Sequence, residues 1–189
     1  MKNILICNQK GGVGKTLISD ELAFMFEADG IKINFFDLDQ QGGTLHETSE
    51  NNDAIVSIID TPGALMSELP EWIKAADMII IPTLMSNRDA APLERMLQIV
   101  KKNKRAKTPV LVIMNRWDRC NITKDFIEWF NTRFPDSKTA VLCNSTAFNQ
   151  ASARGISVQA YRKNGKAAEQ MAQIYGYIKT TLNIKEGWR

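Results

Sequence analysis

The sequence predicts an α/β fold: a single domain built on a mostly parallel, twisted sheet flanked by helices. Short apolar runs rich in β-branched residues recur along the chain, and stretches with helical periodicity separate them. A glycine-rich segment, 9–16, lies between the first apolar run and the first helical stretch. No repeat, low-complexity tract or linker divides the chain. We therefore expect residues 1–189 to form one domain.

The predicted strands are the apolar runs. The first run is mostly apolar and ends at Asn8, as a buried parallel strand would. Strands that alternate with helices form βαβ units, whose carboxyl ends meet at one edge of the sheet. We expect a ligand to bind at that edge. The predicted strands are residues 2–8, 33–37, 54–60, 78–82, 109–115 and 139–143.

The predicted helices show the spacing of an amphipathic face. In the first one, apolar residues recur at i, i+4, i+7 and i+8, starting from Ile18. The polar stretch 40–53 is predicted as a loop with room for one short helix. It contains His46, the only histidine, which we expect at the surface. The predicted helices are residues 16–29, 67–76, 89–103, 123–134 and 165–182.

Composition excludes several classes of protein. Apolar runs are of strand length, far short of the roughly 20 residues of a membrane span. The first apolar run is also too short for a signal peptide. Cys7, Cys120 and Cys143 are far apart and form no C-x-x-C pair. These features predict a reduced, cytoplasmic protein without a structural disulfide or a cysteine-bound metal.

Charge is distributed unevenly along the chain, although the net charge is only +3. Acidic residues dominate 20–71, where Lys32 is the only lysine or arginine. Basic residues dominate 88–119 and 154–189. The pattern has two explanations that composition does not separate: variation of an ordinary surface, or a face that binds a polyanion.

The glycine-rich segment Gln-Lys-Gly-Gly-Val-Gly-Lys-Thr has the chemistry of a phosphate cradle. Glycines lack a Cβ, so their backbone N–H groups can turn toward a polyphosphate, and the following helix adds its N-terminal partial charge. Lys15 supplies a point charge for the outer phosphates, and the Thr16 hydroxyl can bind Mg²⁺. The ordinary pattern G-x-x-x-x-G-K-[ST] fails only at Gln9. Lys10 is therefore an additional cation whose task differs from that of Lys15.

Three further strand ends carry polar groups. Asp37-Leu38-Asp39-Gln40-Gln41-Gly42 follows the second strand, and Asp60 ends the third strand as a Walker B acid does. Asn115-Arg116-Trp117-Asp118 follows the fifth strand and is similar to the base-reading N-K-x-D signature of GTPases. A polar turn remains an alternative there, and these four residues do not decide which base is bound. Together the strand ends predict a site for nucleotide hydrolysis.

These motifs, in this order, resemble the ParA/MinD family of deviant-Walker P-loop ATPases, most closely the short ParA-type partition proteins. The glycine loop matches the family's signature loop, Asp37–Gly42 resembles its second motif, and Ile59-Asp60-Thr61-Pro62 its Walker B. Residues 155–169 resemble its C-terminal G-x-S-V-x-x-Y segment. Gln40 and Leu17 depart from the usual Pro and Thr but supply no required ligand, and Gly63 stands where a second Pro is common.

The resemblance implies roles for individual residues. Lys10, Lys15 and Asp39 would be catalytic: Lys10 would reach the partner's nucleotide across an ATP-sandwich dimer, and Asp39 would position the attacking water. The metal group would comprise Thr16, Asp60 and Asp37, with Asp60 acting through water and Asp37 also supporting its loop. Asn115 would face an adenine. The implied ATP-binding residues are Gly11, Gly12, Val13, Gly14, Lys15, Thr16, Leu17, Asn115 and Arg116.

The implied function is a weak, partner-stimulated ATPase that segregates a plasmid or chromosome. With ATP and Mg²⁺ it would form a homodimer, bind DNA non-specifically and release it when a ParB/ParG-like centromere-binding partner protein stimulates hydrolysis. The protein would be cytoplasmic and associated with the nucleoid when ATP is bound. No helix-turn-helix or winged-helix segment precedes the glycine loop, so operator binding is not expected. The implied DNA-binding residues are Arg154, Arg162, Lys163 and Lys166.

Four alternatives remain open. A MinD-like membrane-cycling regulator would bind lipid through its tail, but residues 180–189 are short and broken by Gly187, so no stable membrane association is expected. An orphan ParA-like protein that positions a protein cargo would have the same sequence features. A GTPase is possible through Asn115 and Asp118. A nitrogenase-iron-protein-like role would need cysteines to bind an iron–sulfur cluster, and the three cysteines here are unsuitable.

The basic residues of 101–107 have two interpretations: they either extend the DNA surface or form a solvated helix end.

Overall fold

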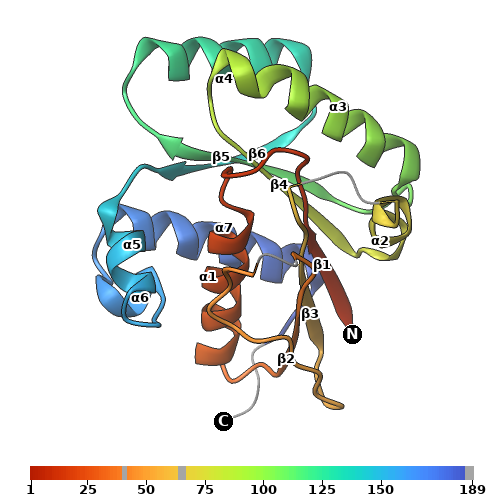
Figure 1. The fold of residues 1–189 in the computed structure, drawn as a ribbon, viewed down its shortest axis with the longest axis vertical. Helices are drawn as coiled ribbons and strands as arrows, with labels where there is room; N and C mark the ends of the chain where they lie inside the picture. Colours follow the sequence, from red (N-terminus) through yellow and green to blue (C-terminus); the bar gives the residue numbers. More distant parts are fainter. Residues whose placement is uncertain (40–41, 64–66, 186–189) are drawn as a thin grey trace.

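Six parallel strands form one sheet in the order β2-β3-β1-β4-β5-β6 (Figure 1). The computed structural model describes residues 1–39, 42–63 and 67–185. This confirms the predicted α/β fold with a parallel sheet. Its strands are β1 (Lys2–Ile6), β2 (Ile33–Asp37), β3 (Val56–Asp60), β4 (Met78–Thr83), β5 (Val110–Trp117) and β6 (Lys138–Cys143).

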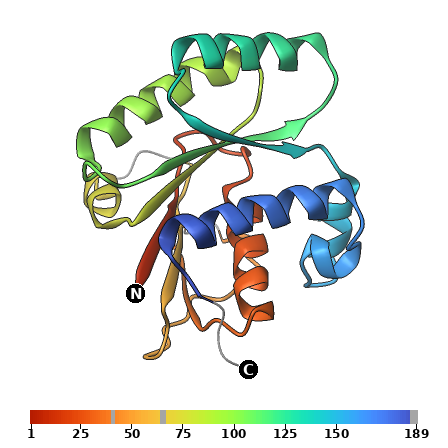
Figure 2. The ribbon, with the colours of Figure 1, turned by 180° about the vertical axis from the view of Figure 1, so that it is seen from behind.

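Helices cover both faces of the sheet (Figures 1 and 2). One face packs against α1 (Lys15–Ala28), α5 (Thr146–Ser152), α6 (Val158–Tyr161) and α7 (Lys166–Leu182). The other packs against α2 (Leu69–Ala75), α3 (Asn87–Asn103) and α4 (Asn121–Arg133). Seen from behind, α7 runs next to α1 (Figure 2).

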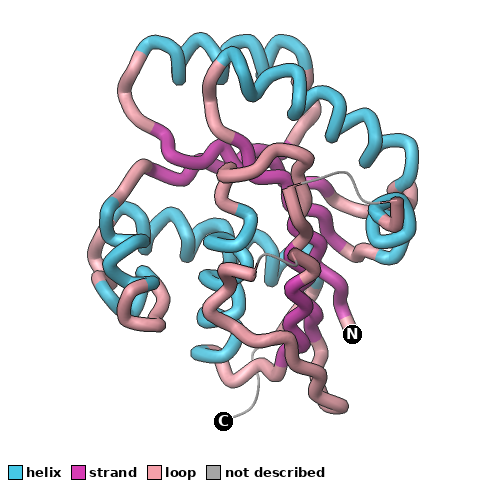
Figure 3. Tube along the Cα trace, in the orientation of Figure 1, coloured by secondary structure: helices cyan, strands magenta, loops and turns pink. Residues whose placement is uncertain are grey.

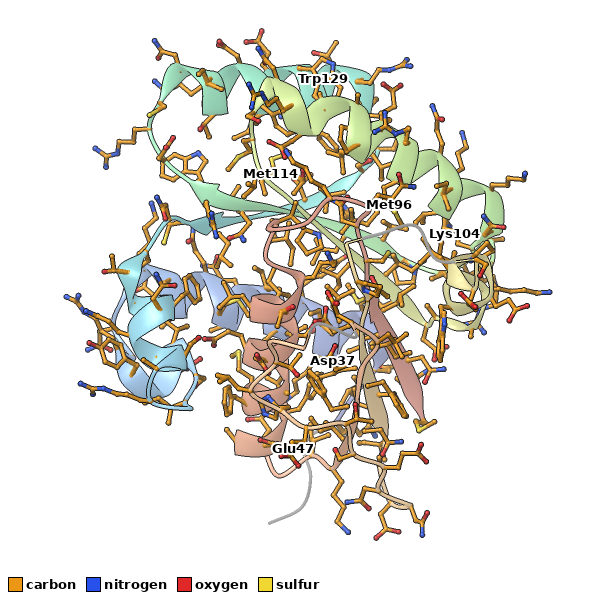
Figure 4. All side chains as sticks on the ribbon, in the orientation of Figure 1. Asp37, Glu47, Met96, Lys104, Met114 and Trp129 are labelled. Carbon is orange, nitrogen blue, oxygen red and sulfur yellow. The ribbon has the colours of Figure 1, made fainter. Side chains whose placement is uncertain are left out.

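The core follows from the alternation of side chains along each strand. In β1, Ile4 and Ile6 face the cluster under α1 and α7, whereas Leu5 faces the cluster under α2–α4. All residues of the central strand β4 are buried, because helices cover both faces there. Figure 4 shows Met96, Met114 and Trp129 on the side of α3 and α4. The continuous apolar runs therefore mark strands buried on both faces.

Most predicted elements occur within a few residues of their expected bounds, but α5 and α6 were not predicted. They contain seven and four residues, too few to show a helical repeat. Each begins after a capping serine: the Ser145 hydroxyl accepts a hydrogen bond from Ala147 N, and the Ser157 hydroxyl from Ala160 N. Those serines were the available signal.

The segment after β2 contains no helix within its described residues 42–53. It returns instead along β2, where Phe35 and Ser49 exchange two backbone hydrogen bonds of 3.1 and 2.9 Å. Figure 3 shows this segment as a long loop beside the sheet. The described part of 40–53 is thus an irregular loop without the short helix that the sequence allowed. Gln40 and Gln41 lie outside the described residues.

Candidate functional site

The polar groups predicted from the strand ends meet at the carboxyl edge of the sheet. Asp37 and Asp60 are register partners on β2 and β3, and Asp60 pairs in turn with Ile6 at the end of β1. The glycine loop follows β1 and leads into α1. Parallel pairing therefore brings together motifs that are separated by tens of residues in the sequence.

The glycine loop has a conformation that requires glycine at two positions. Gly12 and Gly14 have φ angles of 73° and 97°, in the left-handed region. A Cβ atom on Gly14 would lie 2.2 Å from Asn115 Nδ2, so this glycine also permits a close approach to β5. Gly14 is the N-cap of α1, and the loop's backbone therefore lies at a helix N-terminus.

Asn115 supports the glycine loop from behind. Its side chain is buried, Nδ2 donates a 2.9 Å hydrogen bond to the Val13 carbonyl, and Oδ1 accepts one of 2.8 Å from Arg116 N. Arg116 is exposed and has a φ of 57°. These contacts give Asn115 a structural task that the sequence did not reveal. Its contact with adenine stays a prediction, as does that of Arg116.

Lys15 is buried at the base of the loop. Its Nζ donates a 3.4 Å hydrogen bond to the Lys10 carbonyl. Burial lowers the pKa of Lys15, while the charges of Asp60 and Asp39 act in the opposite direction. A buried ammonium group with few partners is costly in isolation. An anion at the loop would supply the missing counter-charge.

Thr16 and Asp60 form the core of a magnesium site. The Thr16 hydroxyl donates a 2.8 Å hydrogen bond to Asp60 Oδ2. Asp60 is fully buried, and burial raises its pKa to about 6. Its Oδ1 accepts no hydrogen bond from the described residues. A buried, unsatisfied carboxylate oxygen beside a hydroxyl fits a water bound to Mg²⁺.

No group of three or more His, Cys, Asp or Glu side chains in the described ranges is arranged to hold a metal. A magnesium ion here would therefore depend on phosphate oxygens and water as well as on Thr16, as it does in P-loop proteins. The third predicted ligand, Asp37, is engaged within its own loop: Oδ1 accepts from Asp39 N at 2.9 Å and Oδ2 from the Thr44 hydroxyl at 2.8 Å. Its part in the metal group stays a prediction.

Lys10 lies near the start of the glycine loop and contacts Asp89 of α3. Asp89 is buried, and it also accepts hydrogen bonds from the Ser86 backbone and hydroxyl, which cap α3. Sequence reasoning missed Asp89, although an acid three residues after a serine is the pattern of a capping box. The additional cation is therefore paired within the chain.

A cavity of about 590 Å³ lies between the ends of β5 and β6 and the start of α7. Trp117, Arg162 and Lys166 are among its lining residues, and Lys166 Nζ lies 4.4 Å from the centroid of the Trp117 ring. This is a cation–π contact. Trp117 was not predicted as a site residue. Two of the four predicted DNA-binding residues, Arg162 and Lys166, thus line this cavity.

The other two predicted DNA-binding residues lie nearby on the surface. Arg154 stacks its guanidinium 4.9 Å from the centroid of the Tyr161 ring, and Lys163 is exposed. All four cations belong to the segment around α6 and the start of α7. Their exposure agrees with a polyanion-binding face, and DNA binding by them stays a prediction.

His46 is more enclosed than expected, because only 12% of its side chain is exposed. It contacts Asp20, Glu27 and two phenylalanines. The expectation of a surface histidine is therefore wrong.

The membrane alternative depends on the tail of the chain, of which residues 186–189 lie outside the described residues. Within the described chain, the helices are too short or too polar to cross a bilayer.

Comparison with known families gives one match over most of the chain. Residues 4–158 match the profile described as the CobQ/CobB/MinD/ParA nucleotide binding domain. The matched range includes the glycine loop, Asp60 and Asn115, which the structure brings together. A search of curated proteins finds no significant match.

Solved structures show the same fold over nearly the full length of this chain. An ATP complex of a McdA variant from Cyanothece is 19% identical, with a TM-score of 0.80 and coverage of 100% of this chain and 99% of that one. The cell division ATPase MinD from Pyrococcus furiosus is 16% identical, with a TM-score of 0.69 and coverage of 95% and 98%. A putative plasmid partition protein from Borrelia burgdorferi, bound to AMPPNP, is 15% identical, with a TM-score of 0.69 and coverage of 94% and 99%.

Proposed function

Because the chain belongs to the CobQ/CobB/MinD/ParA nucleotide-binding domain family, we propose that it is a ParA-type partition ATPase that uses ATP and Mg²⁺. The observation that carries this proposal is the hydrogen bond from Thr16 to the buried Asp60 beside Lys15, with the additional cation Lys10 in the same loop. Structural neighbours with ATP, with AMPPNP and with magnesium and an ATP analogue support the choice of ligand.

Nucleotide binding is assigned to the carboxyl edge. The backbone of residues 11–14 and the Lys15 ammonium bind the phosphates. Thr16 holds the Mg²⁺ through its hydroxyl, and Asp60 holds it through a water. We assign the base to the cavity lined by Trp117, which lies two residues after Asn115, the residue that contacts the Val13 carbonyl of the loop. Asp39 orients the attacking water, and charge that develops on the phosphoryl group is stabilised by lysine and metal.

The proposed dimer is supported by the position of Lys10. Lys15 binds the nucleotide of its own chain, so Lys10 is available for the nucleotide of a second chain. To reach that nucleotide, Lys10 must first leave Asp89. In the proposed dimer it enters the partner's site, where an added cation accelerates phosphoryl transfer as an arginine finger does. The protein would thus be a switch whose dimer forms with ATP.

DNA binding is assigned to the cations around α6 and α7. Arg162 and Lys166 line the cavity to which we assign the base, and this would couple the cations to the bound nucleotide. The contacts are to phosphates and carry no sequence information. A centromere-binding partner protein on the cargo would stimulate hydrolysis and release the DNA.

The proposal is tested in two measurements on the purified protein. Light scattering is measured on the wild type with ADP, on the wild type with ATP, and on Lys10→Ala with ATP. Only the wild type with ATP should form a dimer. Fluorescence anisotropy with a random DNA duplex should then show ATP-dependent binding that weakens steeply between low and moderate salt. A dimer that forms equally with ADP, or a Lys10→Ala dimer that hydrolyses ATP normally, would contradict the mechanism.

The matched control for the DNA surface is at the other end of the sheet. The double variant Arg162→Ala/Lys166→Ala removes two cations of the proposed face, and Lys101→Ala/Lys102→Ala removes two exposed cations at the end of α3. Both double variants should dimerise normally with ATP. Only Arg162→Ala/Lys166→Ala should lose ATP-dependent DNA binding. Equal losses from both double variants would mean that total charge, and not this face, determines binding.

A further inference from the structure

The chain leaves β2 at Asp37 and pairs with it again at Ser49, and the structure describes this loop at residues 37–39 and 42–49. Near its start, Asp37 binds Asp39 N and the Thr44 hydroxyl, at 2.9 and 2.8 Å. At its end, Ser49 pairs with Phe35 through the two backbone hydrogen bonds described above. Asp39, the residue assigned to the attacking water, lies in the first part of this loop. Figure 4 shows Asp37 near the middle of the molecule and Glu47, the residue after His46, closer to its edge.

The middle of the loop is fastened to α1 by one buried carboxylate. Asp20 is 5% exposed and accepts hydrogen bonds from Leu45 N at 3.0 Å and from His46 N at 3.1 Å. It also contacts His46 Nδ1 at 2.8 Å. Asp20 lies four residues after Thr16 on α1, so the two residues share one face of the helix.

The His46 ring fills the space between α1 and β2. Its centroid is 4.3 Å from that of Phe24 in an edge arrangement and 5.3 Å from that of Phe35 in a stacked one. The second ring nitrogen, Nε2, lies 3.4 Å from Glu27. The ring thus makes both polar and apolar contacts, and it joins the loop to the same helix that begins at the phosphate loop.

We propose that His46 is a positioning residue for ATP hydrolysis, which together with Asp20 holds the loop that carries Asp39 in a fixed relation to the phosphates. The inference rests on the proposed function. Because α1 begins at Lys15 and carries Asp20 one turn later, one rigid element sets both the phosphate ligands and the loop anchor. The residues that bind phosphate lie outside the loop, so a loosened loop slows the reaction without weakening nucleotide binding.

The test compares three single variants. His46→Phe keeps the aromatic packing but loses the hydrogen bond to Asp20. His46→Asn keeps a donor close to the position of Nδ1 and loses the ring. Glu47→Gln changes the adjacent exposed residue and is the matched control. Steady-state hydrolysis gives kcat, fluorescent ATP binding gives Kd, and hydrogen exchange of the nucleotide-free protein reports on the amides of residues 42–46.

His46→Phe should lower kcat by roughly ten- to a hundredfold with Kd changed less than twofold, because a misplaced catalytic group has an effect of this size. His46→Asn should recover part of that loss, and Glu47→Gln should match the wild type. Amides 42–46 should exchange faster in His46→Phe. A wild-type kcat in His46→Phe would overturn the proposal, as would a Kd that weakens in step with kcat.

The exchange measurement separates this proposal from the function on which it rests. If the wild-type protein hydrolyses no ATP, the proposed function is wrong, yet faster exchange of amides 42–46 in His46→Phe still supports the anchor. If exchange is the same in both proteins, the anchor itself is wrong, whatever the rate of hydrolysis.

Discussion

Lys10 Nζ contacts the carboxylate of Asp89 within one subunit, although the two residues are 79 positions apart in the sequence. Asp89 is 1% exposed, whereas the Lys10 side chain is 31% exposed. The pair therefore joins a buried acid of α3 to a cation at the surface of the phosphate loop. If Lys10 serves a neighbouring nucleotide, this contact must break first, and a buried charge would lose its partner.

Asp89→Asn should consequently favour the ATP-dependent dimer. The amide keeps an acceptor for the Ser86 cap, but it holds Lys10 less tightly than a carboxylate does. We expect half-maximal dimerisation at a severalfold lower ATP concentration, measured by light scattering during an ATP titration. Glu94→Gln, which removes the other acid of α3, is the control. A dimer that forms at the same ATP concentration in all three proteins would show that the contact does not restrain Lys10.

Gly14→Ala should abolish nucleotide binding and destabilise the protein by about 1–3 kcal/mol, the cost of strained backbone. Its φ of 97° and the 2.2 Å approach of Asn115 Nδ2 both exclude a Cβ atom. Gly11→Ala is the control, since a Cβ there would meet nothing within 4 Å. Thermal unfolding of the nucleotide-free proteins measures the difference. If the two variants unfold at the same temperature, the conformation described for Gly14 is wrong.

Glu21→Gln should change how stability depends on pH. Burial raises the pKa of Glu21 to about 7, against a hydrogen bond from Val158 N. The folded state then binds more protons than the unfolded state between pH ~4.5 and ~7, so this carboxyl destabilises the fold as pH rises through that window. The variant should gain about 1–3 kcal/mol over the wild type at pH 8 and little at pH 5, as measured by urea unfolding.

The control for this experiment is Glu27→Gln, on the same helix but with half of its side chain exposed. The free energy of unfolding of Glu27→Gln should differ little from that of the wild type, because an exposed ion pair contributes little to stability. A difference between Glu21→Gln and the wild type that stays constant from pH 5 to pH 8 would mean that Glu21 titrates as an ordinary carboxyl.

Trp117→Leu should weaken ATP binding by about tenfold, because stacking of a base on an aromatic ring contributes on the order of 1–3 kcal/mol. Lys166→Met should instead weaken DNA binding and change ATP binding little, because Lys166 is assigned to the DNA surface and base stacking depends on the Trp117 ring. Tripolyphosphate has no base, so its affinity should be the same in Trp117→Leu and the wild type. Calorimetric titration measures both ligands, and an equal loss for both would place the base elsewhere.

The sequence predicted the fold and the main site because both depend on local patterns. Apolar runs of strand length mark a buried parallel sheet, and parallel strands necessarily bring their carboxyl ends together. The glycine loop and Asp60 were found in this way, and the structure joins them through the Thr16–Asp60 hydrogen bond.

Contacts between distant segments were not predictable in the same way. Asp89 has the sequence pattern of a helix cap, which conceals its contact with Lys10. His46 lies in a polar stretch, and only the loop's return along β2 encloses it. Trp117 gains its place in the site from Lys166, a residue of another element. In each case the partner comes from tertiary packing, which periodicity along the chain does not encode.

The return of the loop along β2 also protects the sheet from unwanted assembly. β2 is a terminal strand of the sheet, and the outer backbone groups of such a strand can pair with another molecule. Ser49 occupies the outer N–H and C=O of Phe35, and the Thr48 hydroxyl accepts a 3.2 Å hydrogen bond from Asp37 N. The segment proposed to position Asp39 thereby also occupies backbone groups at the outer edge of β2 that could otherwise pair with another molecule.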